Sequence, residues 1–168
     1  MVALCWFLIA LPSFGQKIEV EKRIQETEFP EKARLYIESN FQEMRRLRFY
    51  REQSRDSITY EAKFKMRGER YSAEFYPDGS LMDVEKTIDY LTIGHDAREQ
   101  IEENWEKVFR RWKVMKCQEQ SSPRGKRYEI EVRGRSENGV RLWQYTFTAI
   151  GKLVDRERIL TRSNDMNL

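Results

Sequence analysis

Residues 58–66 read ITYEAKFKM and residues 71–75 read YSAEF, and these two stretches decide the fold. In both, apolar and polar side chains alternate with a period of two, which is the pattern of a strand with one buried and one solvated face. The turn sequence PDG follows at 77–79 and predicts a hairpin into a further strand over 80–88. The chain is therefore predicted to contain an antiparallel sheet that is apolar on one face.

A helical pattern precedes these strands. Ala33, Ile37, Phe41 and Met44 share one face of a helix, because their spacing follows the period of 3.6 residues. A shorter strand is predicted to follow over 46–53. The predicted unit is a helix followed by four antiparallel strands.

The same order of residue types recurs 64 to 72 residues further along the chain. Ala97, Ile101 and Trp105 repeat the helix face. We expect longer hairpin loops in this second copy, over 120–125 and 136–139, because insertions in hairpin loops cost little stability. The alternating stretches of the second copy predict strands over 111–118, 128–132, 143–147 and 152–160.

This internal repetition predicts an α+β fold made of two tandem repeats, each an N-terminal helix followed by a four-stranded antiparallel sheet. The predicted repeats cover residues 16–91 and 92–168. A single unit of about 60 residues would bury only about 60% of its unfolded surface, which is marginal without a disulfide. We therefore expect the two halves to share an interface.

The first sixteen residues carry no charged side chain and include an apolar run over 2–11. This pattern predicts a signal peptide over 1–15, with cleavage between Gly15 and Gln16, and a periplasmic or secreted mature chain. The alternative is a hydrophobic N-terminal strand. The apolar run is too short to span a bilayer, which takes about 20 helical residues, so no transmembrane segment is expected in the mature chain.

The composition and the rare residue types argue against several classes of function. The net charge is only +3, from 31 basic and 28 acidic residues that are interspersed, which argues against nucleic-acid binding. The single histidine, His95, and the one cysteine of the mature chain, Cys117, cannot form a four-ligand metal site. Neither a nucleophile elbow nor a phosphate loop is present. We predict a protein that is not an enzyme and needs no cofactor.

The polar face of the sheet remains as the candidate binding surface, with another envelope protein or peptide as the expected partner. The alternative for this face is a set of solvated cross-strand charge pairs. A third hypothesis is a hydrolase with an unrecognised site. The predicted binding residues are Glu61, Lys63, Glu74, Tyr76, Glu129, Glu131, Gln144 and Thr146.

A second hypothesis for the function is an envelope small-molecule or calcium-binding protein, with its site on the strands. Asp83 and Glu85, like Asp155 and Glu157, are carboxylates at strand spacing i, i+2, so each pair projects from one face of the sheet. Because both pairs recur at matching positions of the two copies, a structural or solvated role is the simpler explanation. Metal ligands are therefore not assigned.

The strand at 60–64, the hairpin at 71–80 and the helix that begins at Phe29-Pro30 together resemble the PepSY-like family of small exported bacterial proteins. That family is similar to the β-lactamase inhibitor protein. The resemblance covers about residues 29–160. It implies a secreted or periplasmic tandem-repeat protein whose sheet binds another protein or peptide, with inhibition of a protein or peptidase as one form of that binding.

Overall fold

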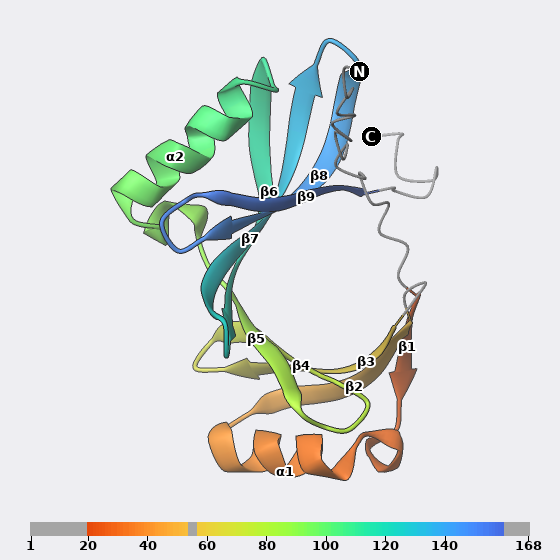
Figure 1. Ribbon diagram of the computed structural model, residues 1–168. Coiled ribbons are helices and arrows are strands. Elements are labelled where there is room, and N and C mark those ends of the chain that lie inside the picture. Colours follow the sequence, from red (N-terminus) through yellow and green to blue (C-terminus); the bar gives the residue numbers. More distant parts are fainter. Residues whose placement is uncertain (1–19, 54–56, 160–168) are drawn as a thin grey trace, which may run out of the picture.

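The computed structural model describes residues 20–53 and 57–159. Nine strands form one antiparallel sheet in which every strand pairs with its neighbours in the sequence (Figure 1). Hairpins and two longer connections that contain helices join the strands. The strands are β1 (Val20–Ile24), β2 (Arg45–Gln53), β3 (Ile58–Met66), β4 (Glu69–Phe75), β5 (Leu81–Thr87), β6 (Arg111–Ser122), β7 (Gly125–Ser136), β8 (Gly139–Thr148) and β9 (Leu153–Ile159).

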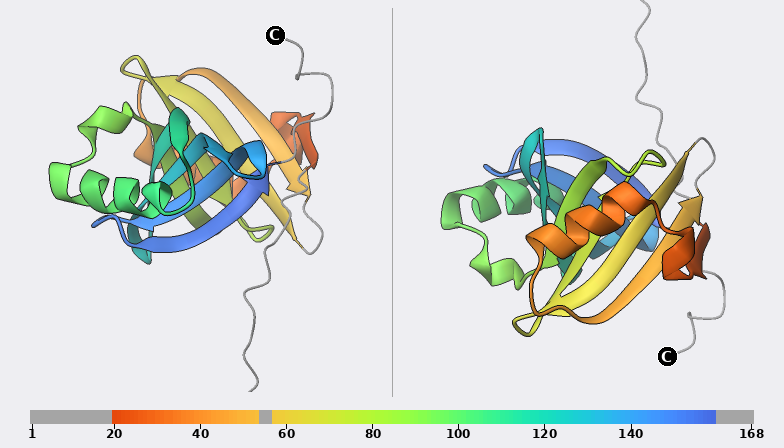
Figure 2. Two further views of the ribbon diagram at one scale, coloured as in Figure 1. Left: turned by 90° about the horizontal axis from the view of Figure 1, so that it is seen from above. Right: turned by 90° about the horizontal axis from the view of Figure 1, so that it is seen from below.

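Two short α-helices pack against the sheet: α1 (Glu31–Asn40) between β1 and β2, and α2 (His95–Glu106) between β5 and β6. Each follows a 3₁₀ turn, η1 (Glu26–Glu28) or η2 (Tyr90–Thr92). The sheet is strongly curved, and both helices lie on its convex side (Figure 1). Seen from below, α1 crosses the outer face of the first strands (Figure 2, right).

The prediction of two repeats, each with its own four-stranded sheet, is wrong. β5 pairs with β6 in register, Val84 opposite Ser121 and Thr87 opposite Gln118, so all nine strands belong to one sheet. The pairing satisfies backbone groups at what would otherwise be two exposed sheet edges. It is possible because β6 and β7 run through most of the segment that was predicted as a loop over 120–125. β1 was not predicted either.

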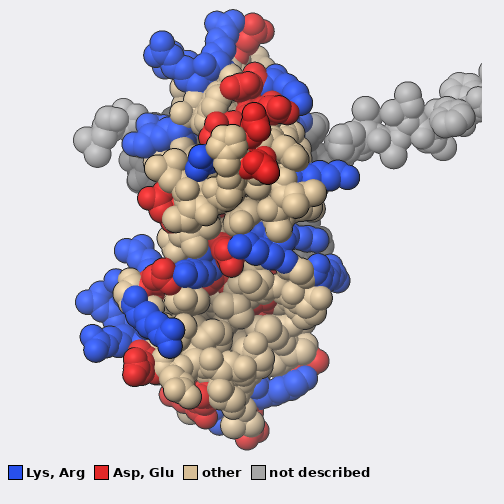
Figure 3. Space-filling view, turned by 90° about the vertical axis from the view of Figure 1, so that its left-hand side faces the viewer, with Lys and Arg blue, Asp and Glu red and all other residues tan. Residues whose placement is uncertain are grey.

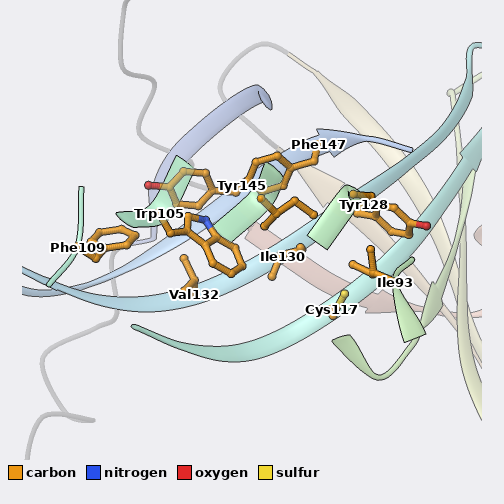
Figure 4. Packing of buried hydrophobic residues seen from close by; sticks show 11 residues of the cluster. Ile93, Trp105, Phe109, Cys117, Tyr128, Ile130, Val132, Tyr145 and Phe147 are labelled. Atoms are coloured by element: carbon orange, nitrogen blue, oxygen red, sulfur yellow. The ribbon is translucent and has the colours of Figure 1, made fainter. Parts of the chain in front are cut away.

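The apolar core lies between the helices and the convex face, in two clusters. The predicted face of α2 is confirmed, since Ala97, Ile101 and Trp105 are buried, and that of α1 is confirmed for Ala33 and Ile37. Phe41 and Met44 lie beyond the end of α1 and are partly buried against the same cluster. Figure 4 shows the cluster under α2, where the rings of Tyr145 and Phe147 lie beside Trp105. The cluster under α1 consists of Ile24, Phe29, Ala33, Ile37, Phe49, Ala62, Phe64, Ala73 and Phe75.

Two glycine turns let hairpins approach the helices closely. A Cβ at Gly79 would lie 2.8 Å from Lys32 Cβ, and one at Gly151 would lie 2.2 Å from the carbonyl oxygen of Ala97. Both glycines have positive φ, +77° and +84°, which disfavours any other residue. Each hairpin therefore contacts the start of one helix.

Some predictions concern residues outside this description. The predicted signal peptide over 1–15 and its cleavage site before Gln16 lie outside the described residues. The division into segments 16–91 and 92–168 stays a prediction. Across residues 20–53 and 57–159, no helix combines the length and the apolar character that crossing a membrane requires.

Candidate functional site

The concave face of the sheet is the side opposite to both helices. Strand residues alternate between the two faces, so Ala62 and Phe64 enter the core while Glu61 and Lys63 point to the concave side. A hollow of about 470 Å³ lies on this face. Its lining is Glu21, Glu52, Ser57, Thr59, Glu61, Lys63, Glu74, Met82, Asp83, Glu85, Lys116, Gln120, Glu129, Glu131 and Gln144.

This hollow, hereafter the acidic hollow, is strongly unbalanced in charge. Its lining includes eight carboxylates and only two ammonium groups, those of Lys63 and Lys116. The side of the molecule seen in Figure 3 differs, because basic and acidic side chains there occur over both the upper and the lower part. In the acidic hollow, by contrast, the carboxylates outnumber the ammonium groups by four to one.

The carboxylates Asp83 and Glu85 lie at the centre of the sheet, on β5. Asp83 is only 6% exposed, and its Oδ2 accepts a hydrogen bond from Gln120 Nε2 at 3.0 Å. Glu85 Oε2 accepts one from Gln118 Nε2 at 2.5 Å. Neither carboxylate forms an ion pair with a cation within 4.0 Å among the described residues.

The environment of these two carboxyls disfavours their ionised forms. Burial, followed by the nearby negative charge of Glu74 and Glu129, raises the pKa of Asp83 to about 7. Burial, followed by the charges of Glu129 and Asp83, raises the pKa of Glu85 to about 8. Near neutral pH, both groups are therefore poised to gain or lose a proton.

Lys63 neutralises a different part of the hollow. Its Nζ lies 2.6 Å from Glu21 Oε2 and 2.8 Å from Glu61 Oε2, and 4.8 Å from the centre of the Tyr50 ring. Burial alone would lower the pKa of Lys63, but the hydrogen bonds to Glu21 and Glu61 outweigh it and raise that pKa. Oxygens of Glu21, Glu52 and Glu61 lie within 4.8 Å of one another, a spacing that could hold a metal ion. Lys63 already contacts two of the three.

The concave face continues into a second hollow of about 450 Å³, which we call the basic hollow. It shares Glu61, Lys63, Glu85 and Lys116 with the acidic hollow. Its lining carries six basic side chains against two carboxylates. The basic side chains are Arg46, Arg48, Lys63, Lys65, Arg70 and Lys116. One continuous face therefore presents an acidic and a basic region side by side.

The structure brings most of the predicted binding residues together. Thr146, on β8, pairs with Glu129 of β7 but does not line the acidic hollow. Tyr76 is 43% exposed in the turn after β4 and lies apart from it. The remaining six, which all line the acidic hollow, are Glu61, Lys63, Glu74, Glu129, Glu131 and Gln144. Whether these residues bind a partner stays a prediction.

The carboxylates of the alternative site are divided between two places. Asp83 and Glu85 line the acidic hollow, whereas Asp155 and Glu157 lie on β9 outside its lining. Gln118 and Gln120 are not among the predicted binding residues, because the predicted strand ends at residue 118 and a loop is predicted from residue 120, where β6 continues to Ser122. The period-two pattern of 116, 118 and 120 was the signal that could have found them.

The fold and the site define an open antiparallel sheet that carries helices on one face and charged hollows on the other. No protein-family model matches the sequence, and no curated protein matches it. Several solved structures share the fold, and three of them are described below.

One of them is described as one of the "putative periplasmic proteins" from Bacteroides eggerthii. It is 16% identical in sequence, with a TM-score of 0.62, and the match covers 81% of this chain and 93% of that one. A BLIP-like protein from Bacteroides fragilis is 9% identical with a TM-score of 0.59, covering 81% and 90%. A DUF2874 family protein from Bacteroides ovatus is 12% identical with a TM-score of 0.60, covering 82% and 93%. At such identities the likeness is one of fold.

Proposed function

We propose that this chain is a periplasmic binding protein without catalytic activity, whose concave face holds a charged segment of another protein or peptide. The observation that carries the proposal is the placement of the helices. Both cover the convex face, and no helix among the described residues covers the concave one. A sheet face with two charged hollows is left for a partner.

Charge complementarity specifies the partner. The acidic hollow favours a basic part of the bound segment, and the adjoining basic hollow favours an acidic part. A partner segment that carries both signs would fit in one orientation only, because like charges placed opposite each other cost several kcal/mol. The proposed partner is therefore an exposed protein segment with a basic and an acidic portion.

The fold relatives support the location and the mode of action. We infer a periplasmic location because one relative is named as periplasmic and because the first residues resemble a signal peptide. The likeness to a BLIP-like protein supports the PepSY-like resemblance of the sequence. Inhibition of the bound protein or peptidase is the form of function that this resemblance implies.

Partner capture with matched variants tests the proposal. The chain from Gln16 onward, with a C-terminal tag, would be exposed to envelope extract, and the captured protein would be identified, purified and titrated back. The concave double variant Glu129→Gln/Glu131→Gln should weaken binding of the purified partner. The convex double variant Glu99→Gln/Glu103→Gln, which removes the same charge from exposed positions of α2, should not. Equal binding by both double variants would overturn the assignment of the face.

Calcium binding in the acidic hollow is the second candidate function, favoured by its eight carboxylates. Calcium prefers six to eight oxygen ligands, and oxygens of Glu21, Glu52 and Glu61 lie within 4.8 Å of one another, where each carboxylate can contribute one or two. Titration calorimetry with calcium chloride at pH 8 would give a saturable heat if the hollow binds calcium. The absence of that heat would remove this candidate.

A further inference from the structure

Two buried hydrogen-bond acceptors on the concave face have no partner in the described part of the chain. They are Oδ1 of Asp83, on a side chain that is 6% exposed, and Oε1 of Gln118, on a side chain that is 5% exposed. A buried polar atom without a hydrogen bond lowers the free energy of unfolding by about 1–3 kcal/mol, so such atoms are rare in native proteins and call for an explanation. Both are oxygens, so a group that satisfies them must donate hydrogens.

The two orphan acceptors belong to one small network on adjacent strands. Gln118 of β6 donates its amide hydrogen to Glu85 of β5, and Glu85 lies two residues from Asp83 on the same face. Asp83 itself is held by Gln120, the next concave-facing residue of β6. The remaining carboxyl oxygen of Asp83, Oδ1, and the amide oxygen of Gln118, Oε1, thereby lack a hydrogen-bond donor, while the network fixes their orientation.

No lysine or arginine of the described residues forms an ion pair with Asp83 or Glu85, although the charge of Lys116 is near enough to lower the pKa of Glu85. Lys63 is committed to Glu21 and Glu61, and Lys116 Nζ lies 3.8 Å from Glu131 Oε1. The lysines that line the acidic hollow are thus engaged elsewhere, while Asp83 and Glu85 have only amide partners among the described residues. A group that supplies both hydrogens and a positive charge would complete the network.

We propose that Asp83, Glu85 and Gln118 form a seat for the guanidinium or ammonium group of an arginine or lysine side chain of the bound segment. This inference rests on the proposed function and names the group recognised where the two hollows meet, since Asp83 lines the acidic hollow, Gln118 lines the basic hollow and Glu85 lines both. Guanidinium and ammonium are the protein side-chain groups that only donate hydrogen bonds and carry positive charge. The seat would make a single cationic side chain the anchor of the partner.

Binding of a cation at this seat should displace protons. Asp83 and Glu85 are faced by Glu61 of β3, Glu74 of β4, Gln118, Gln120 and Lys116 of β6, and Glu129 of β7. Their raised pKa values mean that both carboxyls are partly protonated at pH 7. A bound cation favours the ionised forms. Affinity should therefore rise with pH between 6 and about 8.5.

The probe is a capped pentapeptide with a central arginine between serine and glycine residues. Its counterparts carry citrulline, which has nearly the same shape without the charge, or lysine. Each would be titrated into the ¹⁵N-labelled chain from Gln16 onward, followed by amide chemical shifts. We expect shifts centred on β5 and β6, and arginine or lysine peptides that bind about tenfold or more tightly than the citrulline peptide.

Two matched variants locate the seat. Asp83→Asn keeps the size of the side chain and removes its charge, and should lower affinity for the arginine peptide by about tenfold or more and flatten its pH dependence. Asp155→Asn makes the same chemical change at an exposed position of β9, and should leave both unchanged. A thermal melt of each variant checks that it is folded.

Equal binding of the citrulline peptide, or unchanged affinity in Asp83→Asn, would overturn the seat. These outcomes are separate from a failure of the proposed function. If the natural partner still loses affinity in Glu129→Gln/Glu131→Gln but binds Asp83→Asn normally, the face is correct and the seat is wrong. If neither variant affects the partner, the proposed function fails.

Discussion

The buried side chains on the two faces of the sheet have opposite effects on stability. On the convex face, Trp105 is fully buried and packs edge-on against Tyr145 and Phe147, with ring centres 6.1 and 6.0 Å away. On the concave face, the buried Asp83 and the partly buried Glu85 are carboxyls whose ionisation is disfavoured. The first arrangement stabilises the fold and the second costs stability. Groups of the second kind cluster at functional sites, which is why we assign binding to the concave face.

The largest effect on stability should come from the convex core. Trp105→Ala removes a fully buried indole that four neighbouring rings contact, and should lower the free energy of unfolding by about 3–5 kcal/mol. Urea denaturation followed by circular dichroism measures the loss. A loss below about 1 kcal/mol would mean that α2 does not pack on the sheet as described.

A smaller loss is expected at the close approach of a hairpin to α2. Gly151→Ala must adopt a positive φ and would place a methyl group 2.2 Å from the Ala97 carbonyl oxygen, so we expect a loss of about 2–4 kcal/mol. The matched control is Gly68→Ala, where φ is also positive, +85°, but no atom lies within 4 Å. It should lose about 1 kcal/mol.

Equal losses in these two glycine variants would contradict the close contact. They would show that the backbone conformation alone, and not the proximity of the helix, sets the cost. Denaturation midpoints of the two variants, measured side by side with the original chain, decide this.

The concave face predicts an unusual dependence of stability on pH. The pKa of Asp83 is raised from 3.8 to about 7, and that of Glu85 from 4.5 to about 8. Between these limits the native state holds protons that the unfolded chain has released, so the free energy of unfolding falls as pH rises. From pH 5 to 8 we expect a decrease of several kcal/mol, because each proton that only the native state holds contributes about 1.4 kcal/mol per pH unit. Urea denaturation at a series of pH values measures it.

Asp83→Asn is the control for this pH dependence. It should remove part of the decrease, because an amide does not titrate and carries no charge to desolvate. A curve for Asp83→Asn that parallels the original chain would show that the decrease has another source.

The smallest effect should come from exposed charges on the outer surface. Glu137 forms an ion pair with Arg110 at 2.8 Å, but both side chains are largely exposed. Such pairs contribute little, and Glu137→Gln should change the free energy of unfolding by less than about 0.5 kcal/mol. A larger change in urea denaturation would indicate that the hairpin between β7 and β8 contributes more than its exposure suggests.

Periodicity predicted the parts of the fold that depend on local pattern. The helix faces of Ala33 and Ile37, and of Ala97, Ile101 and Trp105, are buried as expected. The alternation over 58–66 placed Glu61 and Lys63 on the face opposite to the core. These predictions succeed because a core requires apolar side chains at every second residue of a strand and at residues three or four apart on a helix.

An interface between the halves was expected, but its form, the pairing of β5 with β6 in one sheet, was not, because it depends on pairing between distant strands. β5 meets β6 across a connection that contains η2 and α2, and neither strand shows in its own residues which edge it will pair with. The acidic hollow depends on this pairing, since it places Gln118 and Gln120 beside Glu85 and Asp83. The site could therefore be predicted by face but not by its central residues.

The central claim is that the concave carboxyls reduce stability and serve binding, and one double variant tests it most directly. The measurement compares Asp83→Asn/Glu85→Gln with the original chain at pH 8, in its free energy of unfolding and in its affinity for the arginine peptide. Our account predicts a double variant that is more stable, by at least about 2 kcal/mol, and that binds the peptide at least about tenfold more weakly. A double variant that is less stable than the original chain, or that binds equally well, would contradict it.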